Sequence, residues 1–223
     1  MKGVTRGLVI GKFMPPHKGH VHLVDFARGY VDQLTVVVES VAGEPIPSAL
    51  RYGWMQELAH GCRVHHLTTH HPQAPGEHPD FWGLWTRTLT AICPDGIDYV
   101  FASEAYGVRL ADALGARFVP VDPGRDAVPI SGTAIRADPM KNWAHLPDCV
   151  RPYFVRRVCV FGPESTGKTT LARRLAERFE TVAVPEYARA HLESQGGALD
   201  AADMPLIVRG QTAAEDALAR QAR

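Results

Sequence analysis

The sequence predicts an α/β protein in which a parallel-sheet domain is followed by the beginning of a second α/β domain. Short apolar runs alternate with longer helical stretches, as they do in βαβ units. A glycine-bearing loop follows an apolar run at two places, residues 11–20 and residues 162–169. A loop of this kind between a buried strand and a helix directs backbone N–H groups at phosphate. The chain is therefore expected to handle nucleoside triphosphates, in domains that cover residues 1–154 and 155–223.

The elements of the first domain are expected to alternate regularly. Strands are expected at residues 7–10, 34–39, 64–67, 98–102 and 117–121, and helices at residues 19–30, 48–60, 81–93 and 104–114. Ser48 is a candidate N-cap for the second helix, and Gly115 fits the end of the fourth. Three prolines and a glycine predict that residues 69–80 form a loop, which could cover a site.

The second domain is expected to begin with a strand at residues 158–161, the glycine loop and a helix. Leu171, Leu175 and Phe179 would share one face of that helix. A further strand is expected at residues 181–184, and a helix from residue 201 to residue 223. The stretch after residue 158 is shorter than the ~100 residues of most domains. The sequence therefore predicts a truncated second domain.

Composition excludes several classes of protein. Lys plus Arg and Asp plus Glu each count 24, so no basic field favours a nucleic-acid partner. No apolar run approaches the ~18 residues that a membrane span needs, and no signal peptide is evident. The four cysteines have no CxxC spacing. We expect a cytoplasmic protein with small-molecule substrates and neither a nucleic-acid nor a membrane partner, and the sequence leaves open whether it forms a homo-oligomer.

Eleven histidines are present, and six of them lie between residues 60 and 78. Their spacing fits no helical zinc pattern, so loop and strand-edge positions are the favoured interpretation. His70 or His71 could line a pocket.

The first glycine loop carries two histidines that suit phosphate chemistry. His17 and His20 are three residues apart at the start of a helix, which puts both imidazoles on one face. The helix N-terminus adds partial positive charge beside them. Phe13 and two prolines would stiffen the loop, and Gly19 would let a ligand approach the backbone. Triphosphate oxygens, on which charge builds up as a phosphorus–oxygen bond breaks, fit this arrangement.

A second motif lies at the other end of the same domain, in Ile-Ser-Gly-Thr-Ala-Ile-Arg at residues 130–136. Ser131 can cap a helix whose first N–H groups meet phosphate. Arg136 follows about one turn later, and arginine grips pyrophosphate through paired hydrogen bonds. The pair of motifs in one α/β unit is more specific than either motif alone.

Together the two motifs resemble the (H/T)-x-G-H and I-S-x-T-x-x-R signatures of the nucleotidyltransferase superfamily, which implies a Rossmann-like first domain. Residues 11–20 more narrowly resemble the nicotinamide-mononucleotide adenylyltransferases. Residues 136–154, followed by a phosphate loop, are similar to the domain junction of NadR-type proteins, which join such an adenylyltransferase to a ribosylnicotinamide kinase. The resemblance covers the whole chain, densely at the motifs and loosely between them.

The resemblance implies adenylyl transfer from ATP to nicotinamide mononucleotide, which gives NAD and pyrophosphate, with Mg²⁺ as cofactor. It implies catalytic roles for Lys12, His17, His20 and Arg136, and ATP binding by Gly11, Phe13, Gly19, Ser131 and Thr133. Trp85, or else Trp82, is expected against the nicotinamide ring, although both could be core aromatics. Arg51 and Trp54 lie in another family-like helix, with weaker grounds for a direct role.

The second loop matches G-x-x-x-x-G-K-[ST] at every fixed position. ATP binding is expected from Gly162, Gly167, Lys168, Thr169 and Thr170, with the Thr169 hydroxyl as the Mg²⁺ ligand. Pro-Glu-Tyr-Ala-Arg at residues 185–189 is similar to a Glu-Tyr-x-Arg stretch of NadR-type kinases. This similarity implies that Glu186 and Arg189 bind nicotinamide riboside or phosphates.

The kinase half of this chain is nevertheless expected to be inactive or poorly folded alone. A P-loop kinase holds Mg²⁺ through an acidic residue at the end of a later strand, and no apolar strand ending in Asp follows Arg189. We expect the purified 223-residue chain not to phosphorylate nicotinamide riboside. Formation of nicotinamide mononucleotide from the riboside and ATP would contradict this prediction.

Two alternatives stay open at this point. The first keeps the fold and changes the acceptor to another phosphorylated compound, such as pantetheine phosphate. The second is a non-catalytic nucleotide sensor, in which the phosphate-loop unit regulates the first domain.

Overall fold

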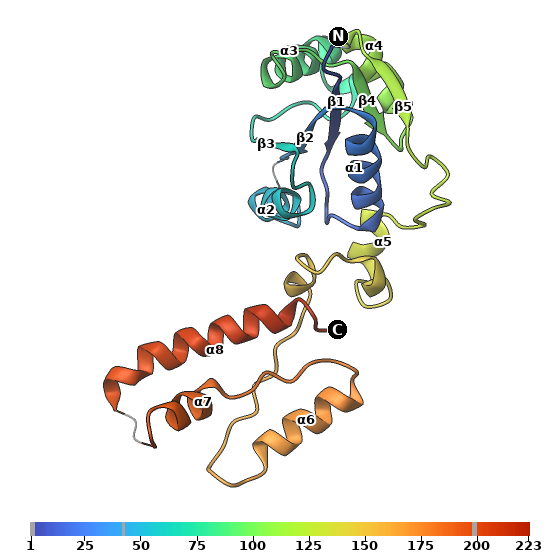
Figure 1. Cartoon of the computed structure of the whole chain (residues 1–223). Helices are drawn as coiled ribbons and strands as arrows, with labels where there is room; N and C mark the ends of the chain where they lie inside the picture. The colour runs from blue at the N-terminus through green and yellow to red at the C-terminus, as the bar shows by residue number, and fades with distance from the viewer. Residues whose placement is uncertain (1–2, 42, 198–199) are drawn as a thin grey trace. The chain divides into compact units, whose positions relative to one another are not determined.

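A computed structural model describes residues 3–41, 43–197 and 200–223 of the chain. It divides into two compact units, Met1–Pro147 and Asp148–Arg223, which are drawn in Figure 1 and are described separately below. The division of the sequence into domains 1–154 and 155–223 remains a proposal.

The first unit is built on a five-stranded parallel sheet. Its strands are β1 (Arg6–Gly11), β2 (Gln33–Glu39), β3 (Arg63–Leu67), β4 (Tyr99–Ala102) and β5 (Arg117–Pro120), in the order β3-β2-β1-β4-β5 (Figure 1). All five predicted strands are confirmed to within one residue at each end. The α/β fold class with a parallel sheet is therefore confirmed for this unit.

Helices cover both faces of the sheet, because alternate strand residues point to opposite faces. The helices are α1 (Lys18–Tyr30), α2 (Ser48–Leu58), α3 (Phe81–Ile92) and α4 (Tyr106–Leu114). Val9 of β1 joins a buried cluster with residues of α1 and α2. Its neighbours Leu8 and Ile10 join a second cluster with residues of α3 and α4. The sheet is thus buried on both sides, as its continuous apolar strands require.

One helix boundary was predicted wrongly and another correctly. Pro47, not Ser48, is the N-cap of α2, and its carbonyl accepts from the N–H groups of Leu50 and Arg51. The proline fixes φ at −51° and so starts the helix one residue earlier than the serine would. Gly115 ends α4 in the left-handed conformation, with φ of 66°, as predicted.

The strand order places a crevice at the carboxyl ends of the central strands β1 and β4. β1 and β4 are neighbours, yet the chain leaves β1 toward β2 and leaves β4 toward β5. The loops after these two strands therefore run in opposite directions, and such a switch point is where open parallel sheets bind ligands. The segments η1 (Pro75–Glu77), α5 (Gly132–Ala137) and η2 (Trp143–His145) complete the unit.

The second unit consists of η3 (Arg151–Tyr153), α6 (Lys168–Arg178), α7 (Tyr187–Ser194), η4 (Ala201–Asp203) and α8 (Met204–Ala219). The strands predicted at residues 158–161 and 181–184 are wrong, because the described part of this unit contains no strand. Val158 and Phe161 are 80% and 89% exposed. A strand forms only where a neighbouring strand takes up its backbone N–H and C=O groups, and the described part offers these segments no such neighbour.

No helix in the described part of the chain combines the length and the apolar character that crossing a membrane requires.

Candidate active site

A cavity of about 670 Å³ opens at the carboxyl ends of β1 and β4. Every residue of the first domain that the sequence predicted for the site lines it: Gly11, Lys12, Phe13, His17, Gly19, His20, Trp82, Trp85, Ser131, Thr133 and Arg136. The two motifs, which are more than 100 residues apart in sequence, thus face one space. Arg51 and Trp54 are not among its lining residues.

The two histidines form a stacked pair at the start of α1. Their ring centroids are 3.7 Å apart, and the Phe13 ring meets His20 edge-on at 5.0 Å. The His17 backbone N–H donates to Nδ1 of His20 at 3.3 Å. Since Nδ1 accepts, the neutral His20 ring carries its proton on Nε2. His20 can therefore act as a hydrogen-bond donor through Nε2.

Burial keeps both imidazoles neutral. It lowers the pKa of His17 from 6.5 to about 4, and the charge of Arg125 and the nearby His145 act in the same direction. Burial also lowers the pKa of His20 well below its ordinary value, helped by His17 and Arg125. A buried Nδ1 of His17 has no hydrogen-bond partner among the described residues.

We expect the His17 ring to stay neutral as the pH falls from 8 to 5 and to protonate near pH 4. Because its folded pKa lies below its unfolded value of 6.5, the stability linked to this ring is complete above about pH 6.5. It is lost as the pH falls through that value toward 4. Titration of the ring protons by nuclear magnetic resonance in the ligand-free protein measures the pKa directly. Protonation of His17 near pH 6.5 would contradict its burial.

The second motif (residues 130–136) contacts the first (residues 11–20) directly. The Ser131 hydroxyl caps α5 by accepting from the Ala134 N–H at 3.1 Å, as predicted. Arg136 donates to the carbonyl of Met14 and to the Thr133 hydroxyl. Its guanidinium thus joins α5 to the loop that carries the two histidines (residues 11–20, the histidine loop) at the edge of the cavity.

Arg51 supports the other side of the histidine loop from within the core. Its side chain is fully buried and donates to the backbone carbonyls of Lys12 and Glu39. It also pairs with Glu44, whose other oxygen lies 3.6 Å from Nζ of Lys12. Arg51 therefore acts by positioning the Lys12 loop. A buried guanidinium needs this many acceptors, because an unpaired buried charge is strongly destabilising.

The tryptophans form the apolar wall of the cavity. Trp85 is 7% exposed, and its indole N–H donates to the carbonyl of Pro72 at 3.1 Å. The His71 ring packs on it at 4.7 Å. Trp82 lies under the guanidinium of Arg109, 5.9 Å from the ring centroid. Neither His70 nor His71 is among the lining residues, so His71 contributes by supporting Trp85.

Seven polar lining residues were missed by sequence reasoning: Glu39, Gln73, Ser103, Glu104, Tyr106, Asp122 and Arg125. Glu39 could have been found, since a polar residue that ends a buried parallel strand lies at the ligand-binding edge. Arg125 had no such signal, because it lies in an irregular segment after β5. That segment is held by Asp122, whose carboxylate accepts three backbone N–H groups.

In the second unit, the phosphate loop leads directly into α6, without the strand that was expected in the described residues before it. Gly162 and Gly167 adopt positive φ angles of 154° and 86°, and Gly167 is the N-cap of α6. Nζ of Lys168 donates to the Pro163 carbonyl at 2.6 Å. Thr169 and Thr170 are exposed on the first turn of α6.

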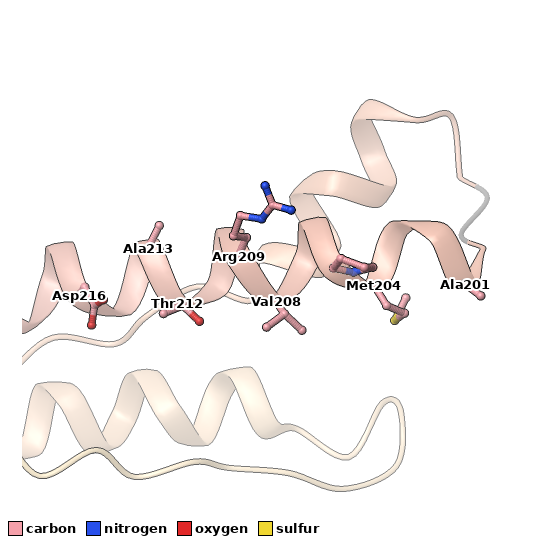
Figure 2. A pocket seen from close by; sticks show the side chains of 8 residues that line it. Ala201, Met204, Val208, Arg209, Thr212, Ala213 and Asp216 are labelled. Carbon is pink, nitrogen blue, oxygen red and sulfur yellow. The ribbon is translucent and has the colours of Figure 1, made fainter.

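The other predicted residues of this unit lie at the start of α7. Glu186 is the N-cap of α7, and its carboxylate is 4.0 Å from the Arg189 guanidinium. A separate hollow of about 830 Å³ runs along α8, and Figure 2 shows the side chains that line it. None of the phosphate-loop residues, Glu186 or Arg189 lines this hollow, so it is not a candidate nucleotide site.

A sequence model of the cytidylyltransferase-like family matches residues 8–138, more than half of the chain. The chain belongs to the cytidylyltransferase-like family. A model of the AAA domain matches residues 157–223. The family match covers the histidine loop and the second motif, and the AAA match covers the phosphate loop.

Two relatives resemble this cytidylyltransferase-like protein over most of its length. The Escherichia coli "trifunctional NAD biosynthesis/regulator protein NadR" is 31% identical over 228 residues, which cover 92% of this chain and 55% of that protein. The chain thus spans about half the length of this relative. The "nicotinamide-nucleotide adenylyltransferase" of Aeropyrum pernix is 29% identical over 185 residues, which cover 78% of this chain and 99% of that protein.

A solved structure agrees with these matches. The crystal structure of a NadR protein in complex with NAD and AMP-PNP superposes with a TM-score of 0.75 at 26% identity, covering 98% of this chain and 66% of that one. The predicted resemblance to NadR-type proteins is therefore confirmed.

Proposed function

We propose that the first unit transfers the adenylyl group of ATP to nicotinamide mononucleotide and forms NAD and pyrophosphate. The observation that carries this proposal is the single cavity that gathers the histidine pair, Arg136 and Trp85. The adenylyltransferase from Aeropyrum pernix and the NAD complex of a NadR protein support the choice of substrate.

The reaction needs no protein nucleophile. A 5′-phosphate oxygen of the mononucleotide attacks the α-phosphorus of ATP, and the bond from that phosphorus to the pyrophosphate oxygen breaks. His20 would donate from Nε2 to the phosphate oxygens, while Lys12 and Arg136 would neutralise charge on the triphosphate. The protein's part is to hold the two substrates in line and to offset the developing charge.

The other predicted residues would define the binding surfaces. The backbone of Gly11, Phe13 and Gly19 would approach the nucleotide closely, and Ser131 and Thr133 would present the N-terminus of α5 to the phosphates. Trp85 would stack on the nicotinamide ring, with Trp82 beside it on α3.

In the second unit we propose a triphosphate site at the phosphate loop, formed by Gly162, Gly167, Lys168, Thr169 and Thr170. The positive φ of Gly167 and the exposed first turn of α6 support this site. Thr169 would hold Mg²⁺, which neutralises phosphate charge when bound, and no hydrogen bond engages its hydroxyl in the described part of the chain. Glu186 and Arg189 would bind nicotinamide riboside or phosphate groups beside it.

The decisive experiment combines the purified chain with ATP, Mg²⁺ and nicotinamide mononucleotide and measures NAD and pyrophosphate. Equal amounts of both products support the proposal. If the chain binds ATP but forms no NAD, it does not have the proposed activity. Pantetheine phosphate is then the next acceptor to test.

A sensor is distinguished from a catalyst by Lys168→Ala. We expect adenylyl transfer to survive this substitution, because the proposed catalytic groups all lie in the first unit. If the protein only senses nucleotide, the unmodified chain would show no adenylyl transfer. Lys168→Ala would then abolish its response to ATP.

A further inference from the structure

Glu39 places a carboxylate in the wall of the cavity. Glu39 is the last residue of β2, is 8% exposed and lines the cavity. Within the described residues, its carboxylate accepts one side-chain hydrogen bond, which the amide of Gln73 donates to Oε1. No described cation lies within ion-pair distance of it, whereas nearby Glu44 pairs with both Arg51 and Lys12.

Burial raises the pKa of this carboxyl, and the charge of Glu44 acts in the same direction. The hydrogen bond from Gln73 and the nearby Lys12 and His71 oppose the shift. A desolvated carboxylate of this kind is stabilised when a cationic ligand arrives.

A short segment links Glu39 to the tryptophan wall. Gln73 donates to Glu39 and also to the carbonyl of His71 at 3.1 Å. Pro72, between them, accepts from the indole of Trp85, and the His71 ring packs on the same indole. Residues 71–73 therefore hold the carboxylate and the aromatic face at the same end of the cavity.

We propose that Glu39 determines which acceptor the cavity takes, by favouring a pyridinium ring with a neutral amide substituent and disfavouring one that carries a carboxylate. The inference rests on the proposed function and deepens it. The face of Trp85 and the charge of Glu39 both attract a cationic ring. A carboxylate on that ring would bring a second negative charge beside a buried one, and like charges at short range in a poorly solvated site repel strongly. Selectivity would come from this repulsion as much as from attraction.

The test measures kcat/KM for nicotinamide mononucleotide and for nicotinic acid mononucleotide in the unmodified chain and in Glu39→Gln. The unmodified chain should favour the amide by more than about tenfold, a discrimination of about 1.4 kcal/mol. In Glu39→Gln the ratio of kcat/KM for the amide to kcat/KM for the acid should fall by about tenfold or more. Glu39→Asp, which keeps the charge, should retain most of the preference.

A matched control is Glu104→Gln, which makes the same chemical change elsewhere on the cavity wall. Glu104 already faces a cation, since its carboxylate lies 3.6 Å from the Arg125 guanidinium. The preference ratio should therefore stay within about twofold of the unmodified chain. ATP affinity, measured by calorimetry, shows that each variant is folded at this site.

The outcomes separate the two proposals. If neither mononucleotide is converted by the unmodified chain, the proposed function fails. If both are converted equally, or if Glu39→Gln and Glu104→Gln change the ratio alike, the function stands and the assignment to Glu39 is overturned. If Glu39→Gln does not fold, Glu39→Asp decides the question, because loss of the preference in a variant that keeps the charge would overturn the assignment.

Discussion

Replacement of His20 by alanine should lower kcat for NAD formation by about 100- to 1000-fold, the usual cost of removing one donor to a transition-state oxyanion. Its Nδ1 accepts from the His17 N–H, which leaves Nε2–H as its free donor, and that donor is lost with the ring. The KM for either substrate should change much less, because the contact strengthens as charge develops in the transition state. Steady-state kinetics with coupled detection of pyrophosphate measures both parameters.

His60→Ala is the matched control for this prediction. His60 is an exposed histidine beyond the end of α2 and does not line the cavity. Its replacement should leave kcat unchanged within about twofold, as expected for a surface site. A kcat for His20→Ala close to that of His60→Ala would show that the histidine pair is structural, and the proposed mechanism would have to be abandoned.

Replacement of Gly132 by alanine should lower kcat/KM by about 100-fold, since a misplacement of the order of 1 Å can have this effect. A Cβ at this position would lie 2.7 Å from the carbonyl oxygen of Met14 and 3.4 Å from the guanidinium of Arg136. The backbone cannot accommodate that approach, so α5 must move away from the histidine loop. Arg136 would then lose its hydrogen bond to Met14, and with it the position proposed for gripping pyrophosphate.

Gly29→Ala provides the control, because this glycine lies in α1 and a Cβ there would meet nothing within 4 Å. It should leave kinetics unchanged and raise the free energy of unfolding by roughly 0.5–1 kcal/mol, the usual difference between glycine and alanine in a helix. Gly132→Ala should instead lower it by about 1–3 kcal/mol, as overpacking does. Urea unfolding and kinetics measured on the same two samples test both statements. Unchanged kcat/KM in Gly132→Ala would mean that the contact between the motifs is dispensable.

The sequence by itself determined the parallel α/β fold of the first unit, because its signals are local. Apolar runs of strand length alternate with helical stretches, and Gly115 ends a helix through its own backbone conformation. The two motifs could be recognised for the same reason, since each is a short loop at the start of a helix. Ser48 was misjudged because a proline one residue earlier fixes the backbone first.

Only the tertiary structure decided which of these residues act together. Arg136 reaches the Met14 carbonyl across 122 positions of sequence, and no local pattern encodes that contact. The neutrality of the histidine pair likewise follows from burial and from Arg125, a residue without any motif. The predicted strands of the second unit failed because strand formation depends on a neighbouring strand, which an apolar run cannot specify. The role proposed for Glu39 also depends on the tertiary structure. Burial raises the pKa of its carboxyl, and Gln73, which is distant in sequence, donates the hydrogen bond to it.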